Sequence, residues 1–307
     1  MTDEQKISRP QATQSAVTFF TQEQKVTNAL SLAGRLAEAV DLTDGARDVV
    51  LAVEEDYRQQ LKEFDVEVQR MDPAELHASA LEAFADYQDV LAQMELSRCV
   101  DNFLCYLSDL LGEIFSAKPE VLKAYSKRQV ALETVLRHSD YASLVQDIAR
   151  TVVHELAYKG LEEISKAFAS HGVDIFPDNK FKKAAIEATA VRNIIVHNRG
   201  VVNDVFLGLV DSEVVERSLP NGTTWRARGY SLPPDLKKGD VFPLTDANMA
   251  NYCGAVWRIV IHIDAAATNK FSLQQMPIPR FCQGLYYYAT GDGLAALTTP
   301  SSILAKE

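Results

Sequence analysis

Two residues that could do chemistry together, Arg192 and His197, stand five positions apart in the string RNIIVHNRG at 192–200. An imidazole has an ordinary pKa of about 6.5, so His197 could accept or donate a proton at neutral pH. A guanidinium stays charged and can hold a phosphate through two parallel hydrogen bonds, so Arg192 could bind such a group. Asn193, the next residue, could orient the imidazole or the phosphate. These three are the candidate catalytic residues.

PDN at 177–179 is expected to start the helix that carries these residues, and the segment predicts an amphipathic helix over 182–209. At about 100° per residue, its polar side chains gather in one stripe. The stripe contains Arg192, Asn193, His197, Arg199 and Asn203, with Lys182 on the same side. Gly200 falls in the middle, where a missing side chain would let a ligand or another backbone approach. Arg192 and His197 flank the stripe, which suits two groups that hold one substrate from either side.

The same string also has a purely structural interpretation. HNRG at 197–200 could end the helix, with Gly200 in the left-handed conformation and a strand after it. A lone histidine beside an asparagine is usually a hydrogen-bonded structural residue. From residue types alone this interpretation is the more common outcome.

Charge is distributed unevenly along the chain. The net charge of the 307 residues is −11, which argues against a protein that coats nucleic acid non-specifically. Residues 1–120 hold 10 Lys and Arg against 23 Asp and Glu, whereas the remainder holds 21 against 19. Within 179–199, five basic residues oppose one acid, Glu187. A positive spot in an acidic protein can localise an anion without making the whole surface basic.

The elements that must position the motif are mostly helices. Helical patterns are expected at 23–42 and from the turn at 43–45 to about Met71. Further helices are expected at 73–117, 119–125, 128–136, 141–170 and 245–265. Turn residues and short β-prone pieces predict an irregular or β arm near 215–245. The expected organisation is a flexible lead-in at 1–22, an N-terminal helical region at 23–94, a helical domain at 95–270 and an irregular tail at 271–307. The predicted fold is therefore mostly α, a multi-helix bundle with an N-terminal helical extension that packs as its own lobe.

Arg, Asn, three apolar residues and His resemble the signature of the HEPN superfamily (higher eukaryotes and prokaryotes nucleotide-binding domain). Arg192, Asn193 and His197 match that signature directly. The extension HNRGVVN, the upstream CYLSDLLGEIF and the later GDVFPLT are similar to segments of bacterial HEPN proteins of the RiboL-PSP and MAE types. The resemblance covers roughly residues 95–270, and the first 90 residues lie outside it.

The resemblance implies a HEPN-like bundle and a metal-independent endoribonuclease that acts as a toxin or phage-defence effector. RNA cleavage by its own 2′-hydroxyl needs a base, an acid and a cation that stabilises the phosphate. The motif supplies a single histidine, so a homodimer would supply the second, with Gly200 at the contact between copies. Arg199, Asn203, Lys182 and Asn198 are the expected RNA- or phosphate-binding residues. An antitoxin or defence-system protein is a possible partner, and a catalytically silent dimerisation or nucleotide- or protein-binding module is the alternative.

No metal site or cofactor is expected. His154 and Glu155 resemble the start of HExxH, but position 158 is Tyr, so the second ligand is missing. Phosphate-binding loops and dinucleotide motifs are absent from the sequence. Four cysteines without CxxC pairing suit a reducing cytoplasm. The N-terminus does not resemble a signal peptide, and the strongest apolar run, AVWRIVIHI, is too short to span a membrane.

Overall fold

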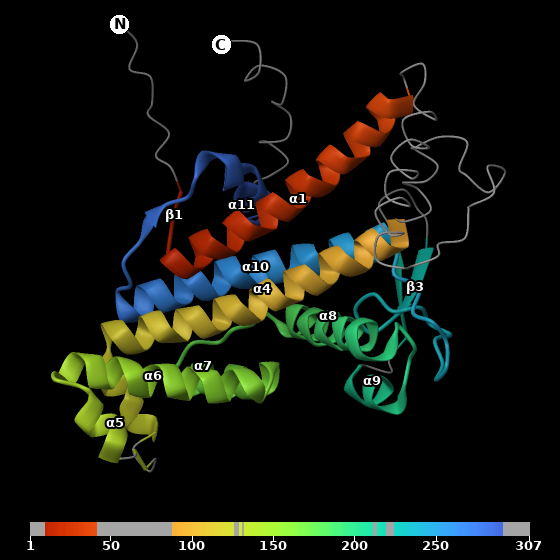
Figure 1. The fold of residues 1–307 in the computed structure, drawn as a ribbon. Helices are drawn as coiled ribbons and strands as arrows, with labels where there is room; N and C mark the ends of the chain where they lie inside the picture. The colour runs from red at the N-terminus through yellow and green to blue at the C-terminus, as the bar shows by residue number, and fades with distance from the viewer. Residues whose placement is uncertain are drawn as a thin grey trace, which may run out of the picture.

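The architecture comes from a computed structural model, which describes residues 10–41, 88–125, 129–130, 132–210, 214–218 and 224–290. Within these ranges the chain is a multi-helix bundle with few strands, as the sequence predicted (Figure 1). The helix expected to end near Met71 and the helix start expected at Pro73 lie outside the described residues. None of the helices in the described ranges is both long enough and apolar enough to cross a membrane.

Two long helices form the centre of the bundle. α4 (Gln88–Ala117) packs along α10 (Asp246–Phe271), and α4 also contacts α1, α6 and α8 (Figure 1). Because α4 has neighbours on several sides, it needs apolar residues on most faces. Fully buried side chains include Leu96, Phe103, Leu107, Leu110 and Ile114. Thr245 caps α10 by accepting a hydrogen bond from the Asn248 amide at 3.2 Å, at the predicted start.

The first described helix, α1 (Gln14–Asp41), crosses over the central pair (Figure 1). The flexible lead-in predicted for 1–22 is wrong from residue 10 onward, because Phe19 and Phe20 are buried in the core. Glu23 accepts hydrogen bonds from Asn102 at 2.6 Å and from Trp257 Nε1 at 2.9 Å. These contacts tie α1 to α4 and α10, so α1 belongs to the bundle and is not part of a separate lobe. The predicted boundary between 94 and 95 falls inside α4.

Four helices follow α4 in the chain: η1 (Pro119–Tyr125), α5 (Leu132–Arg137), α6 (Tyr141–Tyr158) and α7 (Leu161–Ser170). Of these, η1, α6 and α7 contact α4. The single helix predicted for 141–170 is interrupted, because Gly160 has a φ of 85° that a helix interior does not allow. Gly172, with a φ of 71°, then provides the predicted stop after α7.

The motif helix α8 (Asn179–Asn198) packs against both α4 and α10, and the short α9 (Asp204–Leu209) follows it. β2 (Val214–Ser218) and β3 (Thr224–Arg228) form an antiparallel pair that aligns Val214 with Arg228. This pair is the β arm expected near 215–245.

The end of the described chain is more regular than predicted. β4 (Met276–Pro277) pairs antiparallel with β1 (Gln11–Ala12), and η2 (Arg280–Cys282) and α11 (Gln283–Thr290) follow. The irregular tail predicted for 271–307 is therefore wrong up to residue 290. Ile278 and Cys282 are fully buried, and their packing holds this segment against the bundle. All four cysteines are free thiols.

Candidate functional site

The helix that carries the motif begins where the sequence predicted. Asp178 accepts a hydrogen bond from the Phe181 amide at 3.0 Å and caps α8. Four alanines lie on its buried face, and their small side chains let α8 approach α4 and α10 closely: Ala184, Ala185, Ala188 and Ala190. The motif is thus presented on a helix fixed along its inner side.

The helix ends within the motif, so the continuous helix predicted over 182–209 is wrong. Arg199 is in the left-handed conformation at φ 54°, and Gly200 follows at φ 76°. The Gly200 amide reaches back to the carbonyl of Ile194 at 2.9 Å, a helix-terminating hydrogen bond. Val201 then pairs with Val241 in an antiparallel bridge. The structural interpretation of HNRG is therefore correct for the backbone, and Gly200 is buried in this turn instead of lying open in a stripe.

Arg192 is held in place by two neighbours. Its Nη2 lies 2.8 Å from Asp101 Oδ1 on α4, and its Nη1 donates to Asn193 Oδ1 at 3.1 Å. Only 22% of the Arg192 side chain is exposed, against 42% for Asp101. Nε of Arg192 is buried and has no hydrogen-bond partner among the described residues. The guanidinium is therefore oriented by its own chain, and its buried Nε–H group is unused.

His197 lies on the exposed side of the last turn of α8. Within the described ranges its imidazole has no hydrogen-bond partner. Arg192 and His197 thus share a helix, but within one copy no hydrogen bond joins their side chains.

The other predicted binding residues divide into two groups. Lys182 and Arg199 are exposed, so their charges remain open to an anion. Asn203 instead accepts a hydrogen bond from the Phe206 amide at 2.9 Å and caps α9, and Asn198 donates to the Val201 carbonyl. These two asparagines stabilise the turn between α8 and α9. The sequence predicted phosphate binding for both residues, and the structure instead gives them a structural role in the turn that follows the end of α8 at residue 198.

The acid within the basic segment is buried. Glu187 accepts hydrogen bonds from the amides of Tyr230 and Ser231 and from the hydroxyl of Tyr252, the last at 3.1 Å. Burial, together with the neighbouring Glu187, raises the pKa of Tyr252 well above its usual range. Because Glu187 serves these internal donors, its carboxylate does not face a ligand at the surface.

Asp101 is the residue that sequence reasoning missed in this site. It belongs to a different helix, and its spacing from the motif carries no pattern. Sequence reasoning also missed Asp109 and Arg150, which line a groove between α1, α4 and α6. Among the described residues, no group of three or more His, Cys, Asp or Glu could hold a metal ion.

Comparisons of the chain with models of protein families, with curated proteins and with solved structures found no match. Any assignment of function consequently depends on the geometry of α8 and on the resemblance of its motif.

Proposed function

We propose that this protein is a HEPN-type endoribonuclease that cleaves RNA without a metal ion, in the cytoplasm, as a toxin or phage-defence effector. The observation that carries the proposal is the arrangement on α8. A guanidinium oriented by Asp101 and Asn193 and an accessible imidazole at His197 lie on one fixed helix. An antitoxin or a defence-system protein would be its natural partner.

The reaction assigns one role to each side chain. An imidazole removes the proton of the 2′-hydroxyl, and the 2′-oxygen attacks the adjacent phosphorus. The bond from phosphorus to the 5′-oxygen breaks, and a protonated imidazole gives its proton to that leaving oxygen. Arg192 stabilises the extra negative charge on the phosphate. The products are a 2′,3′-cyclic phosphate and a 5′-hydroxyl.

A homodimer would supply the second imidazole. Exposed apolar side chains lie on the elements that meet at the end of α8: Val196 is 50% exposed, Val205 71%, Leu209 54% and Val241 66%. Contact between α8 and α9, and the bridge of Val241 to Val201, bring these elements together. Apolar groups exposed in one region often mark a protein interface. We therefore place the contact between copies at these four residues, beside His197, instead of at Gly200.

One observation favours a second function, a catalytically silent HEPN-like module that binds a partner or a nucleotide. The Asp101 carboxylate already neutralises Arg192 and would repel a phosphate that approached the guanidinium. In that function the ion pair joins α8 to α4, and the motif serves as a stable docking surface.

Incubation of purified protein with single-stranded RNA in EDTA separates the two functions. The nuclease predicts cleavage by wild type and loss of cleavage in Arg192→Ala. The silent module predicts intact RNA, although the protein still dimerises or binds its partner. Lys166→Ala, on the exposed surface of α7, is a matched control for the loss of one positive charge.

A further inference from the structure

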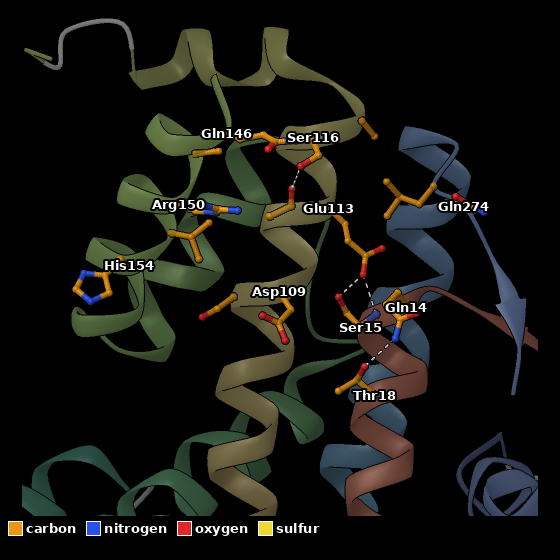
Figure 2. Close-up of a pocket in the computed structure, with 16 residues that line it drawn as sticks. Gln14, Ser15, Thr18, Asp109, Glu113, Ser116, Gln146, Arg150, His154 and Gln274 are labelled. Atoms are coloured by element: carbon orange, nitrogen blue, oxygen red, sulfur yellow. Dashed lines mark hydrogen bonds between the residues drawn. The ribbon is translucent and has the colours of Figure 1, made fainter. Parts of the chain in front are cut away.

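A groove of about 780 Å³ lies on α4, away from the motif helix (Figure 2). One side is formed by the beginning of α1 and the other by α6, and the segment after α10 closes one end. No residue of α8 lines it. Sites for small organic ligands typically enclose roughly 300–1,000 Å³, so this groove has the size of such a site.

Gly112 lies among the α4 residues that line the groove. A glycine within a helix is destabilising relative to alanine. Packing within the chain does not require it, because a Cβ at Gly112 would meet no atom within 4 Å among its neighbours. Its backbone conformation is helical and would accept other residues. A missing side chain here instead leaves room for something that lies on α4.

Opposite charges line the groove without being paired. Asp109 extends from α4, and Arg150 extends from α6 towards α4 (Figure 2). Neither side chain has a hydrogen bond or an ion pair within the described ranges. Although Asp109 is exposed, the surrounding protein reduces its hydration and raises its pKa. A ligand that donates a hydrogen bond would compensate this carboxylate.

The start of α1 is already occupied and does not compete for an anion. Glu113 accepts hydrogen bonds from the amide and the hydroxyl of Ser15, the former at 2.7 Å. Thr13 Oγ1 accepts from the Ala16 amide at 3.2 Å. The amides of Ser15 and Ala16 are therefore satisfied within the chain, and Arg150 is the guanidinium that lines the groove.

We infer that this groove binds a small organic anion that also carries an N–H donor. Arg150 holds its phosphate or carboxylate, Asp109 accepts its N–H group, and its body lies over Gly112 against the apolar side chains of Ala149 and Val153. Nucleotides and short peptides share this chemistry. The inference does not depend on the proposed ribonuclease activity.

Calorimetric titration of the full chain tests the inference with three probes: guanosine 5′-monophosphate, the dipeptide glycyl-leucine and inorganic phosphate. One of the two organic probes should bind saturably, and which one binds identifies the source of the ligand. Arg150→Gln and Asp109→Ala should each weaken binding about 10- to 100-fold, the usual effect of losing a hydrogen bond to a charged group. Gly112→Leu should abolish binding by filling the groove, and Gly112→Ala should keep most of it.

Three controls keep the outcome decisive. Gly112→Leu should unfold no earlier than wild type on heating, since leucine favours a helix more than glycine. Lys166→Gln, outside the groove, should bind as wild type does. Mass measurement in solution should show the same oligomer for every variant. The inference is overturned if neither organic probe binds, if phosphate alone binds as tightly, if the groove variants bind normally, or if Gly112→Leu dissociates an oligomer.

Discussion

The guanidinium of Arg192 on α8 contacts the carboxylate of Asp101 on α4, with 2.8 Å between Nη2 and Oδ1. This ion pair connects the motif helix to the centre of the bundle. If the protein cleaves RNA as proposed, this ion pair would have two opposite effects. It would orient the guanidinium for catalysis, and it would place a negative charge where a phosphate approaches.

Replacement of Asp101 by Asn separates these two effects. A negative charge about 4 Å away costs a bound phosphate ~1 kcal/mol even in water, so RNA affinity should rise roughly fivefold. Turnover should fall, because the guanidinium loses its fixed orientation. Stability should change by less than about 1 kcal/mol, since partly exposed ion pairs contribute little. Steady-state cleavage kinetics of Asp101→Asn therefore should show a lower KM with a lower kcat, and a higher KM would show that Asp101 assists binding.

Charge introduced at the apolar end of α8 and α9 should prevent dimerisation. Leu209→Glu would place a charge within the proposed contact, and burial of an unpaired charge costs several kcal/mol, so the dimer dissociation constant should rise by at least about a hundredfold. Leu136→Glu, on α5 and 75% exposed, is the matched control and should leave the dimer intact. Analytical ultracentrifugation at micromolar concentration measures both. A wild-type monomer under these conditions would exclude a site shared between copies.

Asn203 should matter for folding and not for RNA. Asn203→Ala removes the cap of α9 and should lower the free energy of unfolding by about 1 kcal/mol, whereas Asn203→Ser keeps a capping oxygen and most of that energy. RNA affinity should be unchanged in both variants. Urea denaturation measures the change in stability, and RNA titration measures the affinity. A loss of RNA affinity without a loss of stability would support the binding role that the sequence predicted for Asn203.

Asp264 should make stability depend on pH. Burial raises its pKa to about 6, although Thr13 donates hydrogen bonds to it from its amide and hydroxyl. The unfolded value is lower, so the folded state favours the neutral acid. The contribution of Asp264 to the free energy of unfolding is fully present below about pH 4 and is lost as pH rises through 6. A pKa difference of about two between the folded and unfolded states corresponds to a loss of roughly 3 kcal/mol.

Comparison of wild type with Asp264→Asn isolates this contribution, because an amide does not titrate. As pH rises from 4.5 to 7.5, the free energy of unfolding of wild type should fall relative to that of Asp264→Asn. Urea denaturation at both pH values measures it. A difference that does not change with pH would mean that Asp264 is ionised throughout.

The sequence predicted those helix starts that are determined by neighbouring residues. Asp178 and Thr245 cap α8 and α10 through amides three residues away, so their sequence neighbours reveal them. The start of α1 has a non-local cause. Thr13 is held by Asp264, 251 residues later, and Ser15 by Glu113, 98 residues later. Nothing near residues 13–15 indicates these partners, which explains why a flexible segment was expected there.

The motif likewise combines features with local causes and features with non-local causes. Its residue types and spacing identified Arg192, Asn193 and His197 on one helix. The predicted polar stripe continues past the true end of α8, because Arg199 and Gly200 take left-handed conformations that end the helix. A helical wheel assumes continuous helix and cannot detect such a turn. Asp101 and the groove residues Asp109 and Arg150 depend on how helices pack, and no spacing within one helix encodes that.

Cleavage of single-stranded RNA by wild type and His197→Ala, in EDTA and with analysis of the product ends, tests the central claim most directly. His262→Ala, on α10, is the imidazole control. Wild type and His262→Ala should leave a 2′,3′-cyclic phosphate and a 5′-hydroxyl. His197→Ala should cleave ~10²–10⁴-fold more slowly while remaining folded and dimeric, because the proton-transfer group is lost. Cleavage that survives in His197→Ala, cleavage that needs magnesium, or an inert wild type would contradict that claim.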